Sequence, residues 1–193
     1  MGLDIQIRTD QDDKILEEIH SDDSIKLRGT LSRSFLPFIY REHEPNDEEL
    51  SQISEITGID LMPLIEMGLY PDSLDEEYQL STCESDEEKR KVQDKLNASK
   101  LKYAKPIDSI LETLNRLDNY LKSNPEYYKE LKLSDTSEES LRYFKNYSLD
   151  PEPTKYGLIS HSDATLGVDI RAMIKYLEFA KSRQATITHF SFG

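Results

Sequence analysis

The stretch that decides the fold is YGLISHSDATLGVDIRAMIKYLEFAKSRQATITHFSF, residues 156–192. It begins with a short apolar run, passes through a polar His-Ser-Asp turn at 161–163, and continues as a helical pattern. It ends in the alternating segment ATITHFSF, residues 185–192, which predicts a strand. The segment LDIQIR, residues 3–8, predicts another strand at the opposite end of the chain. Strands near both termini with helical sequence between them favour an α+β fold.

We expect residues 1–193 to form one helix-rich domain in which the terminal strands share a small sheet. A helical middle segment spans about residues 85–148, and we expect it to pack over one face of that sheet. The short strand that we expect before the His-Ser-Asp turn, the helix after the turn and the final strand suit a parallel crossover unit. Other elements are expected as follows: helices over 10–20, 46–58 and 60–68, a strand over 24–32, and an exposed loop over 69–88.

Local signals mark several of the helix ends. Ser85 and Glu88 form a capping-box pattern, and Thr136 and Glu139 repeat it. Asp10 stands where a helix cap is wanted. These positions are predicted to begin three of the helices.

Charge is the most informative property of the composition. The chain has a formal net charge of −14, and residues 1–84 hold 21 acidic against 6 basic side chains. Such an excess repels nucleic acid and anionic membranes and speeds encounters with basic partners. We therefore expect a basic protein partner, with no direct nucleic-acid or membrane binding, and a continuous acidic face before Glu84.

Other composition features exclude classes of protein. No run approaches the roughly 18 apolar residues of a membrane-spanning helix, and the first residues lack the pattern of a secretory signal. The single cysteine, Cys83, cannot form an intrachain disulfide, which favours a cytoplasmic protein. His43, between Glu42 and Glu44, lacks the further ligands of a metal motif, so neither a metal nor a cofactor is expected.

The His161-Ser162-Asp163 turn contains the residue types of a nucleophilic triad. Adjacent residues rarely converge into a nucleophile, a base and an orienting group, and no G-x-S-x-G elbow surrounds Ser162. We interpret the turn as structural, with Gly167 supplying an unusual backbone angle before the helix. A weaker alternative keeps His161 and Asp163 in a cleft.

Candidate binding residues come from acidic and tyrosine-bearing segments, because tyrosine on a polar surface is typical of recognition faces. The predicted partner-binding residues are Asp47, Glu48, Glu49, Tyr70, Asp72, Asp75, Glu76, Glu77 and Tyr78. Arg33 and Arg41 bracket an apolar block in this acidic region. Each arginine either pairs with a nearby carboxylate, which we favour, or lines a cleft that grips an anion.

The opening MGLDI, the segments LSRSF (31–35) and ISEITGIDLMPLIEMGLYPD (53–72), and the turn YGLISHSD followed by glycine together resemble a family of small bacterial and phage-encoded proteins. Its members begin Met-Gly-Leu-Asp and carry a strand ending in His/Phe-Ser-Asp before a glycine and a helix. The family has no established activity, so the resemblance implies a cytoplasmic bacterial or mobile-element protein without catalytic residues. Residues 164–166 are Ala-Thr-Leu where an acidic residue or cysteine often follows the Ser-Asp.

Three functions fit these observations. The first is a non-enzymatic acidic binding protein, such as an immunity protein or antitoxin-like inhibitor that neutralises a basic toxin or effector. The second is a nucleic-acid-mimicking inhibitor or regulator from a phage or mobile element, and the third is a small hydrolase with a site near His161. The first two predict binding that weakens steeply with salt, and the first is our working hypothesis.

Overall fold

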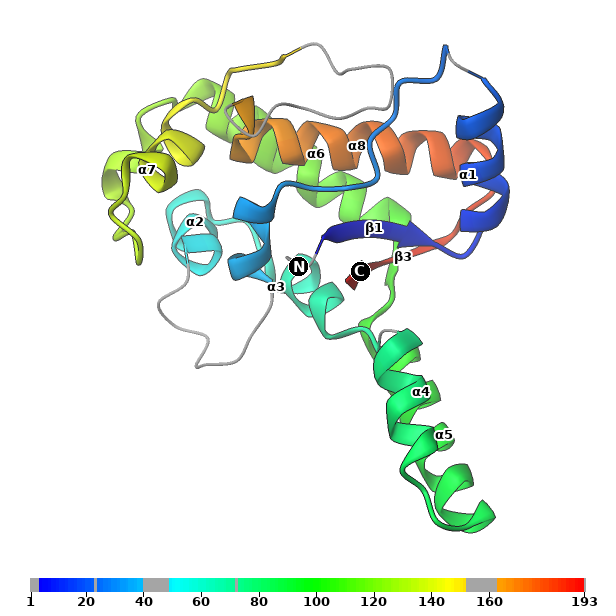
Figure 1. Cartoon of the computed structure of the whole chain (residues 1–193). Helices are drawn as coiled ribbons and strands as arrows, with labels where there is room; N and C mark the ends of the chain where they lie inside the picture. The colour runs from blue at the N-terminus through cyan, green and yellow to red at the C-terminus, as the bar shows by residue number, and fades with distance from the viewer. Residues whose placement is uncertain (1–3, 23, 40–48, 72, 152–162, 193) are drawn as a thin grey trace.

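The computed structural model describes residues 4–22, 24–39, 49–71, 73–151 and 163–192. Figure 1 shows a body of packed helices and a small sheet, from which a helical hairpin projects. The elements, in chain order, are β1 Ile5–Thr9, α1 Asp12–Ser21, η1 Arg33–Phe38, α2 Glu49–Thr57, α3 Met62–Glu66, η2 Met67–Leu69, α4 Ser73–Ser81, α5 Asp86–Tyr103, β2 Lys105–Pro106, α6 Ile107–Ser123, η3 Tyr127–Glu130, α7 Glu138–Lys145, α8 Leu166–Ser182 and β3 Ile187–Phe192.

The chain ends meet in one antiparallel sheet, with strand order β1-β3-β2. β3 lies in the centre, because it pairs with β1 from Ile5–Phe192 to Thr9–Thr188 and with β2 at Lys105 and Pro106. The inward side chains of β1 are buried isoleucines, as the alternating sequence predicts. The prediction of an α+β domain whose sheet joins both termini is confirmed.

Two long helices, α6 and α8, pack side by side over the sheet (Figure 1). Apolar residues recur every three or four positions along α6, so one face of that helix is buried. α8 is buried over most of its length, including Asp169 in its first turn and Arg171 two residues later. These two helices and the sheet therefore enclose the centre of the hydrophobic core.

The buried carboxylate of Asp169 on α8 holds three segments together. Its oxygens accept hydrogen bonds from the amide of Ser32 at 3.0 Å, from the Ser32 hydroxyl, and from the Tyr143 hydroxyl at 2.9 Å. The guanidinium of Arg28 lies 3.4 Å away. Burial raises the pKa of Asp169, while Arg28 and the hydrogen bonds from Ser32 and Tyr143 oppose that shift. The carboxylate thus ties α8 to the segment before η1 and to α7.

Arg171, two residues after Asp169 on α8, is the centre of a second buried polar cluster. Its guanidinium donates to the carbonyl of Tyr147 at 3.2 Å and to that of Leu149. The Tyr147 hydroxyl donates to Asp118 on α6 at 3.1 Å, and Arg171 lies 3.5 Å from the same carboxylate oxygen. This cluster joins α6, the end of α7 and α8.

Position 167 requires glycine because the backbone of Tyr147 approaches it closely, and not because its backbone angle is unusual. A Cβ at this position would lie 2.0 Å from the Tyr147 carbonyl oxygen. Among the described residues, the positive φ angles belong to Gly58 and Gln184. Our expectation of a special φ at Gly167 is therefore wrong, whereas Gly58 does end α2 in the left-handed region, as expected.

Several expected elements differ from the structure. Residues 24–32 form no regular strand. The segment runs beside β1, where the amide of Ile7 donates to the Gly29 carbonyl and the amide of Leu31 donates to the Ile5 carbonyl. The pairing amounts to an isolated bridge between Gln6 and Thr30. The segment expected to be an exposed loop contains the helix α4. The first strand of the expected crossover lies outside the described residues.

Two of the predicted helix N-caps are not formed by the residues that we expected. Asp10 does not cap α1; its carboxylate accepts from the amide and hydroxyl of Thr186, at the far end of the chain. Ser137, and not Thr136, caps α7 by accepting from the amide of Ser140. The Ser85 cap of α5 forms as predicted.

Replacing Asp169 with alanine is expected to destabilise the fold by about 3–5 kcal/mol, because Arg28 and the hydroxyls of Ser32 and Tyr143 would lose their buried partner. Chemical denaturation followed by circular dichroism measures this loss. Glu112→Ala on the exposed face of α6 is the matched control and should stay within about 0.5 kcal/mol of the wild type. Equal stability of the two variants would contradict this role of Asp169.

Candidate functional site

The most distinctive surface feature is the hairpin of α4 and α5, which we call the arm (Figure 1). With 18 residues, α5 is about 27 Å long. Its main contacts with the body lie at its root, where α5 meets η2. The arm therefore presents most of its surface away from the hydrophobic core, so our expectation that the segment 85–148 packs over the sheet is wrong for α5.

Local sequence explains why the arm forms. The Ser85 hydroxyl accepts from the Glu88 amide and caps α5, and the Glu88 carboxylate accepts from the amide of Glu84, one residue before the cap. Leu96 on α5 is buried, and Lys100 on α5 pairs with Glu76 on α4 at 2.5 Å. The two helices contact each other, and this ion pair joins them.

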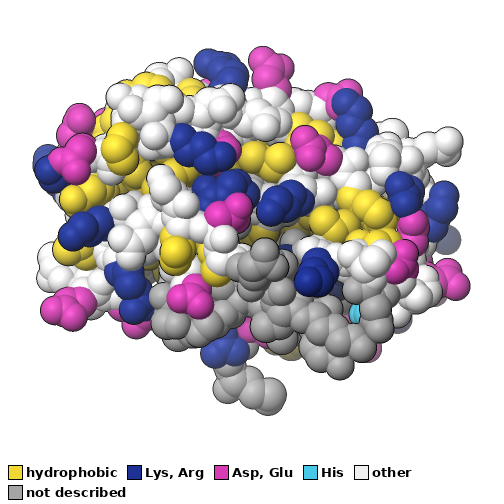
Figure 2. All heavy atoms as spheres, turned by 90° about the horizontal axis from the view of Figure 1, so that it is seen from above, with side chains coloured by type: hydrophobic (Ala, Val, Ile, Leu, Met, Phe, Trp, Pro, Cys, Tyr) yellow, Lys and Arg dark blue, Asp and Glu magenta, His cyan; other side chains and the backbone are white. Residues whose placement is uncertain are grey.

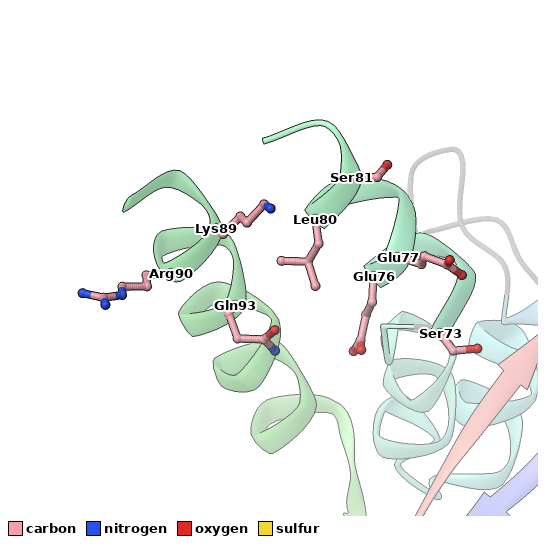
Figure 3. A pocket seen from close by; sticks show the side chains of 8 residues that line it. All are labelled: Ser73, Glu76, Glu77, Leu80, Ser81, Lys89, Arg90 and Gln93. Carbon is pink, nitrogen blue, oxygen red and sulfur yellow. The ribbon is translucent and has the colours of Figure 1, made fainter. Parts of the chain in front are cut away.

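A groove of about 720 Å³ runs between the helices of the arm. Figure 3 shows Leu80 projecting from α4 into the space between the helices, with Lys89 and Gln93 on the α5 side. In the same view Arg90 points away from α4 and Glu77 points away from α5. The groove therefore has an apolar floor between one acidic and one basic helix.

The outer surface of the arm carries large side chains that water reaches. Tyr78 on α4 is 70% exposed, and Leu101 on α5 is 85% exposed. The acidic residues along the outside of α4 and around the connection to α5 are also exposed: Glu77, Glu84, Asp86, Glu87 and Glu88. Aromatic and apolar groups bordered by charge are typical of protein-binding surfaces.

At the root of the arm, a smaller cavity of about 310 Å³ lies between the arm and the sheet. Its walls come from β1, β3, α1, α4 and α5, and include Arg8, Asp12, Tyr70, Lys100 and His189. The ring of Tyr70 stacks on that of His189, with centroids 3.7 Å apart and planes inclined by 20°. This root cavity therefore joins the arm to the sheet through polar and aromatic side chains.

Burial lowers the pKa of His189 to about 4, and the cations Arg8 and Lys100 add to that shift while Asp12 opposes it. The imidazole is therefore neutral at pH 7. Its Nδ1 atom is buried and makes no hydrogen bond with any group in the described part of the chain.

The structure separates the predicted acidic binding residues into different environments. Glu49 is buried, and its carboxylate accepts from the amide and hydroxyl of Ser134 at 2.7 Å. Glu76 is committed to Lys100. Glu77 and Tyr78 are exposed on the arm, whereas Tyr70 packs on His189 at its root. Asp47, Glu48, Asp72 and the side chain of Asp75 lie outside the described residues.

The predicted cleft residues are not brought together by the described part of the structure. Arg33 pairs with Asp4 at 3.2 Å, which confirms the internal pairing that we favoured for it. Arg41 and His161 lie outside the described residues, and Asp163 is half-buried just before α8. The hypothesis of a hydrolytic site near His161 stays untested.

Acidic side chains of the first 84 residues do not form one continuous face in the described regions. Some of them pair with cations from later in the chain: Glu18 with Arg183, Glu66 with Lys105, and Glu76 with Lys100. Seen from above, the body shows acidic and basic side chains interspersed with apolar ones (Figure 2). The exposed acidic side chains of the described part of residues 1–84 are therefore spread over α1, α2, the turns at Asp10, Asp22 and Asp60, and the arm.

Two features of this region escaped prediction from the sequence. The helical nature of α4 could have been found from its helix-favouring Leu, Glu and Gln residues, but Pro71 and the acidic composition favoured a loop. The root cavity had no local signal, because His189 lies in an ordinary alternating strand and Lys100 in a solvated helix.

Comparison of the chain with protein-family models, curated proteins and solved structures finds no significant match. The described helices include none that is long and apolar enough to cross a membrane. The resemblance to small bacterial and phage proteins consequently stays a prediction, and functional inference depends on the geometry of the arm and its root.

Protonation of His189 is expected to weaken the fold in acid. An unfolded histidine binds a proton below about pH 6.5, whereas the folded one does so only near its pKa of about 4. Stability therefore falls as pH drops through this window, because the unfolded state binds more protons there. His189→Gln removes this contribution, so its melting temperature should fall less between pH 7 and pH 4 than that of the wild type.

His20→Gln is the matched control, because it makes the same substitution at an exposed position outside the cavity. Differential scanning calorimetry at closely spaced pH values makes the comparison. A His189→Gln profile parallel to that of the wild type would show that this side chain titrates normally in the folded protein.

Proposed function

We propose that this protein is a non-enzymatic binding protein that holds a basic protein partner on the arm. The observation that carries the proposal is the projecting hairpin, with Tyr78 exposed in the second half of α4 and Leu101 exposed in the last turn of α5. Two helices that meet the body only near their root bury little apolar area of their own. Contact with a partner would cover these side chains and add to the stability of the hairpin.

Charge supports a basic partner. The sequence of α4 contains three acidic residues and no basic one, and further carboxylates follow at the connection to α5. Glu77, Glu84 and Asp86 are exposed there. With the net charge of −14, this distribution favours fast, salt-sensitive association with a cationic surface. A partner that presents lysine or arginine would approach α4 and the end of the arm.

A basic toxin or effector neutralised in the cytoplasm, as by an immunity protein or an antitoxin-like inhibitor, is the partner class that we propose. Stoichiometric inhibition needs an exposed, complementary surface and no catalytic group. Tyr78 supplies the kind of aromatic anchor that often dominates such interfaces, and the surrounding carboxylates supply orientation.

The test uses a partner obtained by affinity capture from the native host and then purified. Tyr78→Ala should weaken its binding by tenfold or more, since truncating an aromatic anchor costs about 2 kcal/mol or more. Glu77→Lys should slow association mainly at low salt. Surface plasmon resonance at several salt concentrations measures both effects, and Glu112→Lys, an exposed reversal on α6, should bind nearly as the wild type does.

Two results would contradict the proposal. One is a captured partner whose affinity is unchanged by either arm substitution. The other is turnover of phosphoesters or acyl esters by the isolated protein that His161→Ala abolishes, which would favour the hydrolase hypothesis.

A further inference from the structure

The root cavity is bordered by residues from parts of the chain that are far apart in sequence. Arg8 comes from β1, Ser191 from β3, Ser73 from the start of α4, and Lys100 from the last turn of α5. These four residues carry hydrogen-bond donors and line one partly open cavity of about 310 Å³. That volume lies at the lower end of the range for small-molecule sites.

The guanidinium of Arg8 is held in place by the carboxylate of Asp12, which also accepts other hydrogen bonds. Asp12 accepts from the Thr9 amide at 2.8 Å, from the Tyr176 hydroxyl at 3.1 Å, and from Arg8 at 3.1 Å. With its oxygens already engaged, Asp12 acts as a support that orients the guanidinium. Arg8 also donates to Gln6, and a guanidinium has five N–H groups in all, so donors remain for a ligand.

Lys100 forms the opposite wall. Its ammonium group pairs with Glu76 at 2.5 Å, and its side chain is 34% exposed. An ammonium group has three N–H donors, so the ion pair with Glu76 does not exhaust it. Ser73 begins α4, and the amino end of a helix favours negative charge. The two acidic side chains that border the cavity, Asp12 and Glu76, are thus already paired, with Arg8 and Lys100. Arg8 and Lys100 each keep N–H groups beyond those used in these pairs.

The remaining walls are neutral and partly apolar. Tyr70 stacks on His189, and Pro71 lies beside them. A phosphate group alone would not fill a cavity of this volume, so the stacked rings and Pro71 leave room for a small organic group. Tetrahedral phosphate accepts hydrogen bonds from several directions, which suits donors that come from four different elements.

We propose that the root cavity binds the phosphate group of a small phosphomonoester. Arg8 and Lys100 contact the phosphate oxygens, Ser73 and Ser191 complete the set of donors, and the Tyr70–His189 stack borders the organic part. This site is separate from the protein-binding surface of the arm. It stands or falls independently of the function proposed above.

The experiment titrates the full chain at pH 7 with inorganic phosphate and, separately, with ribose 5-phosphate, while chloride keeps the ionic strength constant. Amide shifts in ¹⁵N-correlated NMR spectra report binding. Saturable shifts centred on Arg8, Lys100 and His189 are expected. If ribose 5-phosphate binds more tightly than inorganic phosphate, the cavity also contacts the organic group. If the two bind equally, the ligand is inorganic phosphate and the phosphomonoester part of the proposal is wrong.

Lys100→Gln and Arg8→Gln should each weaken phosphate binding about tenfold, because each removes a charge-assisted contact. The two substitutions lie in different elements, so loss in both variants with the fold retained by circular dichroism would not come from one local defect. Lys95→Gln is the matched control, since Lys95 is exposed on the same helix and does not border the cavity.

Three outcomes would overturn the proposal. They are the absence of saturable shifts with both probes, shifts that chloride reproduces at the same ionic strength, and unchanged affinity in both cavity variants. Loss of phosphate binding in Lys95→Gln equal to that in Lys100→Gln would also do so, because it would indicate nonspecific attraction to α5.

Discussion

The fold depends on one buried negative charge, the carboxylate of Asp169. A carboxylate at such a position is costly unless donors surround it, and it obtains them from Ser32, Tyr143 and Arg28. Two of these lie 137 and 26 residues away in sequence. The requirement to satisfy a single group therefore fixes the segment before η1, the helix α7 and the start of α8 relative to one another. Hydrophobic burial supplies most of the stability, whereas this charge restricts how the layers can be arranged.

Features encoded by neighbouring residues could be predicted from the sequence. The strands at both ends and the Ser85 cap of α5 needed only short-range patterns, and both are present. Long-range competition explains the failures. Asp10 was expected to cap a helix, but its carboxylate binds Thr186 because β3 places that residue beside it. The nine residues of α4 favour a helix, but its packing against α5 is a contact between two helices that no pattern within those residues reveals.

In the candidate site, too, contacts between residues far apart in sequence decide what the sequence alone cannot predict. An acidic run in a sequence does not disclose which carboxylates the folded protein neutralises. Glu66 and Lys105 are 39 residues apart, and Glu18 and Arg183 are 165 apart, yet both pairs form. Sequence reasoning could therefore identify Glu77 and Tyr78 as surface candidates together with Glu49, but only tertiary structure separates the exposed residues from the buried one.

The position of the root cavity gives the arm a physical connection to the sheet. A hairpin whose main contacts lie at one end takes its direction from the segments that flank it. Just before α4, Tyr70 stacks on His189, and beside the end of α5 the Glu66–Lys105 ion pair joins the end of α3 to β2. Because α5 is about 27 Å long, these flanking contacts set where Glu84 and Asp86 are presented. The carboxylates that would meet a partner and the cavity that would hold a small ligand thus belong to one helical hairpin.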